Sequence, residues 1–150
     1  MSEKEVNKRF DHLLKQDKIS VSIEGSYLYK FKFDLPEEAI ANLSGKFFKD
    51  RLYQFRLKFE TSSRFQAITF YYEMCSMFRE KYGVPIEVPS ILVEKKSDYV
   101  FIQGNRKIEI DYPAYSSFFV TYIDIPVDAE KDEFDKKQQA KSDSITKKDI

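Results

Sequence analysis

One segment, residues 62–85, predicts a long helix in the middle of a chain whose other apolar segments mostly alternate with a period of two. At about 100° per residue, its apolar side chains gather on one side and its polar side chains form a stripe opposite. The apolar set is Ala67, Ile68, Tyr71, Cys75, Phe78 and Tyr82. Ser63 with Gln66 can close a capping box, and Gly83 followed by Pro85 ends the helix. One amphipathic helix among strands favours an α+β fold.

A second apolar row on the same helix is the candidate partner-binding site. Phe70, Met74 and Met77 are spaced i, i+4, i+7, with Tyr72 at the margin, and they widen the apolar arc beyond what packing on one sheet requires. Either a first helix or the 127–150 tail covers this row, or the row contacts a protein partner or a second copy of the chain. Methionine and aromatic side chains are frequent at adaptable interfaces, which supports the second interpretation.

The segments before this helix predict one helix and several strands. Residues 2–16 form a helix that Ser2 and Glu5 can cap, with a narrow apolar stripe through Val6 and Phe10. Residues 18–33 alternate around a Gly-Ser turn and predict a hairpin. A short helix is expected over residues 37–43, ending near Gly45, because Pro36 with Glu37 and Glu38 can open it. Residues 52–60 predict a strand with one face in water.

The segments after the helix predict a second group of strands and a polar tail. Residues 86–94 lie between or beside prolines and suit an edge strand or an extended connection. Residues 99–112 predict a hairpin, and residues 117–125, apolar on both faces, predict a strand that is central or covered on both sides. We therefore expect a single α+β domain over residues 1–126, with an antiparallel sheet of five to seven strands. Residues 127–150 are expected to be disordered or a frayed helix over about 129–141.

Composition and residue types argue against several classes of function. Lys plus Arg and Asp plus Glu balance at 25 each, so no net field attracts nucleic acid or an anionic membrane. No segment is apolar enough to span a membrane. Cys75 is the only cysteine and His12 the only histidine, on different helices, so no catalytic triad is in view. Glu109 and Asp111 share a strand face, but alternating charge usually marks a solvated face rather than a metal site. We expect no enzyme activity, no cofactor and no metal.

Several short motifs carry a resemblance to a known group of proteins. They are the Met1–Val6 start of the first helix, Leu52-Tyr53 opening a strand, Lys81-Tyr82-Gly83-Val84-Pro85 ending the main helix, and Thr121-Tyr122-Ile123-Asp124 closing the sheet. Together with the order of elements, they make most of residues 1–126 resemble small bacterial α+β modules of the BamE (SmpA/OmlA) lipoprotein and β-lactamase-inhibitor-protein fold. The resemblance implies an exported, non-catalytic binding or assembly module, and it carries over no site residues.

Two classes of function remain open on the sequence. The first is a non-catalytic protein-binding or assembly module, which needs an exposed apolar patch. The alternative is an inhibitor or immunity-type protein that binds a specific enzyme, which needs a charged, shape-matched face. The sequence shows no face dominated by one sign of charge, which favours the first class. A cytoplasmic location is expected if Met1 is the native start, and a cell-envelope location if a leader was removed.

Overall fold

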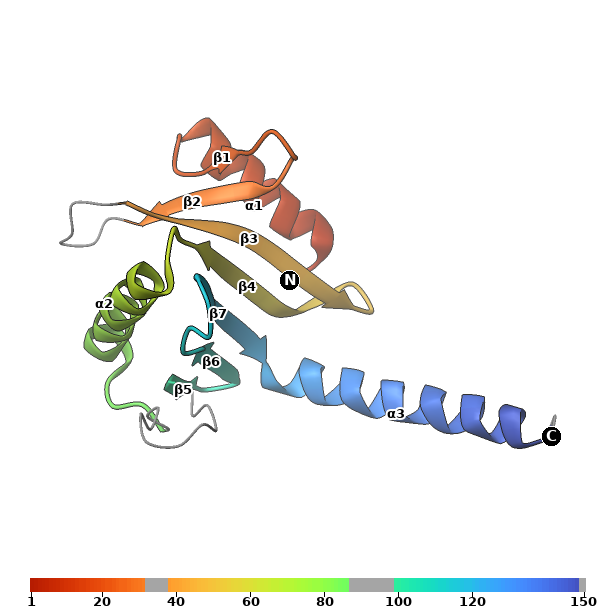
Figure 1. Ribbon diagram of the computed structural model, residues 1–150. Coiled ribbons are helices and arrows are strands. Elements are labelled where there is room, and N and C mark those ends of the chain that lie inside the picture. Colours follow the sequence, from red (N-terminus) through yellow and green to blue (C-terminus); the bar gives the residue numbers. More distant parts are fainter. Residues whose placement is uncertain (32–37, 87–98, 149–150) are drawn as a thin grey trace.

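The computed structural model describes residues 1–31, 38–86 and 99–148, and it shows an α+β fold with a seven-stranded antiparallel sheet (Figure 1). The elements in chain order are α1 (Glu3–Lys15), β1 (Ser20–Val21), β2 (Tyr27–Phe31), β3 (Ala39–Phe48), β4 (Arg51–Glu60), α2 (Arg64–Tyr82), β5 (Tyr99–Gln103), β6 (Arg106–Ile110), β7 (Ser117–Asp124) and α3 (Ile125–Lys148). The strand order is β1-β2-β3-β4-β7-β6-β5, and every neighbouring pair is antiparallel. The predicted fold class is confirmed.

The first two helices begin at the predicted caps. Ser2 Oγ accepts a hydrogen bond from the Glu5 amide at 3.2 Å, and the Glu5 carboxylate accepts one from the Ser2 amide at 2.7 Å, so α1 has a complete capping box. Ser63 Oγ accepts from the Gln66 amide at 3.1 Å. The Gln66 side chain, however, accepts from the amide of Ser62 rather than from Ser63. The start of α2 is therefore capped by a variant of the expected box.

The strand β7 occupies the centre of the sheet, as its apolar sequence predicts. It pairs with β4 on one side and with β6 on the other. Phe118 and Val120 are buried on the inner face, which is the face that carries α1 and α2. On the outer face, the Arg56 guanidinium lies 4.7 Å from the centre of the Phe119 ring. Both faces of this strand are thus covered by side chains.

The prediction of a short helix over residues 37–43 is wrong, because residues 39–48 form β3. Ala39, Ala41 and Leu43 face inward and pack in the core, while Ile40 is exposed on the outer face. This period of two is that of a strand, and β3 bonds to β2 and β4 along both edges. Pairing on both sides outweighs the helix signal of Pro36 and the two glutamates. The predicted edge strand over residues 86–94 lies almost entirely outside the described residues.

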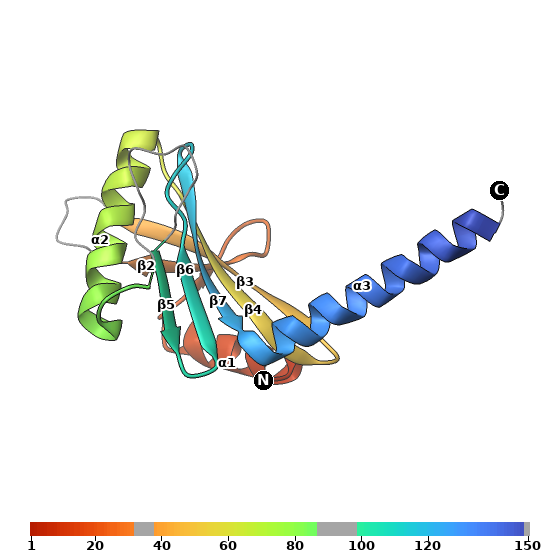
Figure 2. The same ribbon diagram turned by 90° about the horizontal axis from the view of Figure 1, so that it is seen from below.

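Both α1 and α2 pack on the inner face, over different parts of it (Figure 2). The cluster beneath α2 joins buried side chains of that helix to strands β3 to β7, and Phe59 stacks on Phe118 with ring centres 4.8 Å apart. The cluster beneath α1 is smaller and contains buried Val6, Phe10 and Ile19. Leu43 and Phe55 contact both clusters, which joins them into one layer.

The helix α3 leaves the sheet and extends away from it (Figure 1). Asp124 accepts a hydrogen bond from the Val127 amide at 3.1 Å, which caps the helix at its start. Its first turns contact the β3–β4 hairpin through the ion pair of Glu130 with Arg51 and the ring of Phe134 against Phe48. The side chains described from residue 135 to 145 are all exposed. The helix is thus longer than the segment expected over 129–141.

Candidate binding groove

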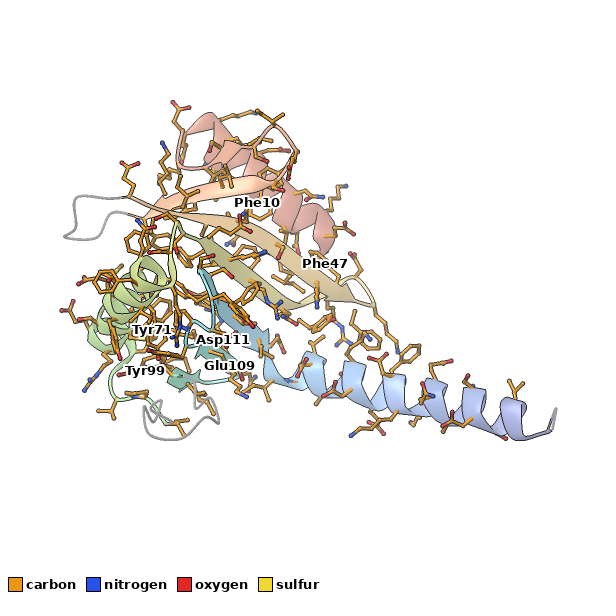
Figure 3. The ribbon with its side chains drawn as sticks, viewed as in Figure 1. Phe10, Phe47, Tyr71, Tyr99, Glu109 and Asp111 are labelled. Atoms are coloured by element: carbon orange, nitrogen blue, oxygen red, sulfur yellow. The ribbon has the colours of Figure 1, made fainter. Side chains whose placement is uncertain are left out.

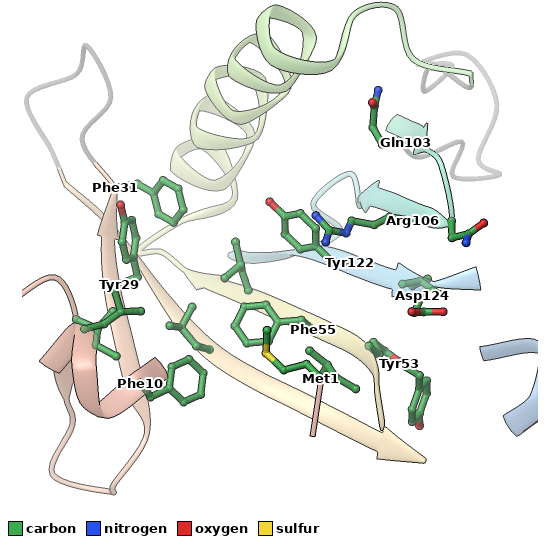
Figure 4. Close-up of a pocket in the computed structure, with 18 residues that line it drawn as sticks. Met1, Phe10, Tyr29, Phe31, Tyr53, Phe55, Gln103, Arg106, Tyr122 and Asp124 are labelled. Atoms are coloured by element: carbon green, nitrogen blue, oxygen red, sulfur yellow. The ribbon is translucent and has the colours of Figure 1, made fainter. Parts of the chain in front are cut away.

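An apolar groove with a volume of about 690 Å³ lies on the inner face of the sheet, between α1 and the β5–β6 turn (Figure 4). Most of its lining consists of apolar and aromatic side chains from α1, from the segment before β1, and from strands β2, β3, β4 and β7. They are Phe10, Leu13, Ile19, Tyr29, Phe31, Leu43, Leu52, Tyr53, Phe55, Leu57 and Tyr122. Gln103, Asn105, Arg106 and Asp124 add polar groups at one end. A cavity of this size and lining is typical of a binding site.

Strand alternation explains why these side chains share one face. Successive side chains of a strand point to opposite faces, so Tyr29 and Phe31 of β2 lie on the same side as Leu43 of β3. Phe55 pairs directly with Tyr122, which extends the apolar floor from β4 to β7. The groove therefore continues the same inner face that α2 covers elsewhere.

Several side chains of the groove are less buried than the residues beneath α2. Tyr71 lies between α2 and the sheet (Figure 3) and is fully buried, as are Phe59 and Phe118. By contrast, Tyr29 in the groove is 37% exposed, and Phe31, Leu43, Phe55 and Tyr122 are only partly buried. Aromatic surface left open to water beside a closed core makes this end a candidate interaction site.

The polar end of the groove holds one basic and one acidic side chain among its described lining residues, Arg106 and Asp124. Arg106 extends toward the ring of Tyr122 (Figure 4). Burial raises the pKa of Tyr122, the nearby Tyr82 raises it further, and Arg106 opposes both effects. Gln103 donates to the carbonyl of Tyr82 at 3.3 Å, which fixes the β5–β6 hairpin to the end of α2. The phenol of Tyr122 stays neutral at physiological pH.

The described groove holds none of the side chains most common as catalytic nucleophiles or bases. No serine, cysteine or histidine lines the described groove. Cys75 belongs to α2 and is buried, and this burial raises the pKa of its thiol to about 12. His12 is exposed, and its Nε2 atom lies 3.0 Å from the side-chain Nε2 of Gln16. A reactive nucleophile beside a base is therefore not assembled in the part of the chain that the structure describes.

The two carboxylates considered for a metal have other surroundings. Glu109 forms an ion pair with Lys107 at 2.6 Å, on the same strand, and the backbone amide of Asp111 bonds to Phe119. Across residues 1–31, 38–86 and 99–148, no group of three or more His, Cys, Asp or Glu side chains gathers that could hold a metal ion. Burial and the neighbouring Asp132 raise the pKa of Asp128, at the start of α3 near Glu109.

The structure separates the three residues of the predicted partner site. Phe70 is 4% exposed and Met74 is fully buried, and both pack in the cluster between α2 and the sheet. Met77 is 41% exposed and Tyr72 is 45% exposed. The cover over Phe70 and Met74 is thus the sheet itself, rather than α1 or α3. A partner contact at Met77 stays a prediction.

The groove itself was missed by reasoning from the sequence. Its inner-face residues in β2, β4 and β7 were identified by alternation, and the stripe of α1 through Phe10 was identified by helical spacing. The sequence carried no signal for how much of that face the helices leave open. Arg106 falls within the hairpin predicted over residues 99–112, but its position beside Tyr122 follows only from the pairing of β6 with β7.

Among the described residues, no helix combines the length and the apolar character needed to cross a membrane. No protein family model, no curated protein and no solved structure shows a significant match to this chain.

Proposed function

We propose that this protein is a non-catalytic protein-binding or assembly module and that the groove is its binding site. The observation that supports this proposal is the groove itself, about 690 Å³ in volume and lined by partly exposed aromatic and aliphatic side chains. Burying such a surface against a partner is favourable by about 25 cal/mol per Å² of apolar area before the costs of association. The resemblance to BamE-like modules implies the same class of function.

The partner segment that best fits the groove is an amphipathic helix. The floor of the groove is made of apolar side chains such as Phe55, Leu57 and Leu43, which offer no partners for a backbone. An extended peptide would leave backbone amides and carbonyls without hydrogen bonds where it is buried, whereas a helix satisfies its own. A helix can therefore insert one row of apolar side chains while its polar side stays in water.

A tyrosine pair provides a matched test. Tyr29 lies in the groove at 37% exposure, and Tyr115 lies outside it, in the β6–β7 connection, at 81% exposure. The tagged protein would be used to capture partners from a lysate of its native host, with bound proteins quantified by mass spectrometry. We expect Tyr29→Asp to lose a partner that Tyr115→Asp retains, because only the first places a charge in the apolar groove.

Two controls accompany the capture experiment. The melting temperatures of both variants are measured first, and the comparison is made at equal concentrations of folded protein. Retention of every captured protein by Tyr29→Asp would contradict the groove as the binding site. Loss of the same proteins by both variants would point to a general effect on the fold.

A further inference from the structure

The polar end of the groove carries a guanidinium that forms no ion pair with a described side chain. Arg106 is the first residue of β6, its side chain is exposed, and it is the only basic side chain among the described lining residues. It forms no side-chain hydrogen bond or ion pair with the described residues. It extends toward Tyr122, at the border between the polar end and the apolar floor (Figure 4).

The nearest candidates for neutralising this charge have other partners. Asp124 is directly opposite Arg106 in the pairing of β6 with β7, but its carboxylate accepts from the Val127 amide at the start of α3. A carboxylate at the start of a helix is held there by the helix dipole as well as by the hydrogen bond. Glu109 pairs with Lys107. Arg106 therefore has no ion-pair partner among the described residues, although Asp124 keeps its negative charge at the same end of the groove.

We propose that Arg106 determines the specificity of the groove by pairing with an acidic side chain of the bound helix. This inference rests on the proposed function, because it assumes that a helix occupies the groove. Apolar side chains of the helix would fill the region from Phe10 to Phe55, and a Glu or Asp next to that row would meet Arg106.

The chemistry of the guanidinium supports a carboxylate as its partner. A guanidinium offers a planar set of donors that matches both oxygens of a carboxylate, and such charge-assisted bonds are stronger than neutral ones. The apolar floor ends at Tyr122, so an ion pair formed here is partly removed from water when the helix binds. A pair at this place also fixes the direction of the helix, because Arg106 is the only basic side chain that lines the described groove.

A selection experiment can test this inference without knowledge of the natural partner. The probe is a display library of 16-residue amphipathic helices with Leu, Ile or Phe at four positions on one face and random residues beside them. Selections are run on the full wild-type chain and on the variants Arg106→Glu and Arg9→Glu. Arg9 is an exposed arginine of α1 that does not line the groove, so it is the matched control.

We expect an acidic residue to be enriched at one fixed position on the wild type and on Arg9→Glu. On Arg106→Glu, we expect Lys or Arg at that position. For individual peptides, Arg106→Gln should weaken binding by about tenfold, and replacing the acidic residue of the peptide by Gln should remove that difference. Melting temperatures establish that the variants are folded.

Failure of this inference differs from failure of the proposed function. Peptides that lose binding to Tyr29→Asp but show no acidic preference, and that bind Arg106→Gln equally well, would overturn the role of Arg106 alone. If no selected peptide depends on Tyr29, both proposals fall. Binding of oleate in the groove, in the absence of any peptide binding, would indicate a lipid ligand and would also overturn both.

Discussion

The two ends of the inner sheet face carry the same kind of side chains but differ in how far these side chains are buried. Beneath α2, Phe59, Tyr71 and Phe118 are completely buried. Beside α1, Tyr29 and its neighbours line an open groove. The difference lies in the helices, because α2 has six buried side chains over 19 residues, whereas α1 has two over 13. A sheet of uniform apolar character thus becomes core at one end and the floor of an open groove at the other.

The largest effect should come from truncating a side chain beneath α2, at the closed end of the inner face, rather than one beside α1, at the open end. Phe70→Ala removes a side chain that is 4% exposed, and it should lower the free energy of unfolding by roughly 3–5 kcal/mol. Tyr29→Ser, in the open end, should cost about 1 kcal/mol or less, because its ring is already partly in water. Denaturant titration of both variants measures the contrast. Equal losses would mean that the groove is as tightly packed as the core.

The second-largest effect is expected from alkaline pH, which should destabilise the closed end. Burial raises the pKa of Tyr71 and of Cys75, the latter to about 12 from an ordinary value of 9.0. The unfolded chain therefore releases these protons at a lower pH than the folded chain, so stability is fully present below pH 9.0 and falls as pH rises toward 12.

Unfolding titrations between pH 8 and pH 11, together with labelling of the thiol by a disulfide reagent, test this expectation. The thiol should react slowly in the folded protein and rapidly in denaturant. Fast labelling of the folded protein at pH 8 would show that the closed end opens readily.

The helix caps allow the two ends to be weakened separately. Ser2→Ala and Ser63→Ala should each cost about 1 kcal/mol of stability, because each removes a side-chain acceptor for a helix amide. Only Ser2→Ala loosens the helix that forms a wall of the groove, so only that variant should also weaken the peptides selected above. Fluorescence anisotropy with a labelled peptide measures the difference. A similar loss for Ser63→Ala would mean that the two ends are coupled.

The smallest effect is expected from shortening α3. Removing residues 139–148 keeps Glu130 and Phe134, which contact the hairpin, and removes side chains that are exposed as far as they are described. The free energy of unfolding should change by less than about 0.5 kcal/mol, while the helical circular dichroism signal falls. Removal from residue 129 onward serves as the contrast, because it also deletes the contact of Phe134 with Phe48. A large loss from the shorter truncation would assign the exposed part of α3 a structural role.

The elements that were predicted well are those with strong local signals. The caps at Ser2 and Ser63, and the stop at Gly83 with a φ of 85°, depend on residues only a few positions apart. Alternation in β4 and β7 was long enough to assign both faces. Residues 37–43 were misassigned because two alanines and a preceding Pro-Glu-Glu resemble a helix start, while the evidence for a strand lies in the distant partners β2 and β4.

The candidate site was less predictable than the fold. The row of Phe70, Met74 and Met77 was correctly placed on one helix, but the sheet buries the first two and leaves the third partly exposed. The extent of cover depends on where α2 crosses the sheet, which no spacing within the helix encodes. Arg106 could not be recognised, because the role proposed for it depends on its place beside Tyr122 of a different strand.

By itself, the sequence determined which segments become α1, α2 and most strands, and which side chains of each strand face inward. Those properties follow from helical and strand periods and from capping residues, all of which act over a few positions. Only the tertiary structure decided that β3 is a strand, that α2 covers one end of the inner face, and that a groove remains at the other. These depend on strand order and on how two helices of unequal apolar width share one sheet, which are contacts between residues far apart in the chain.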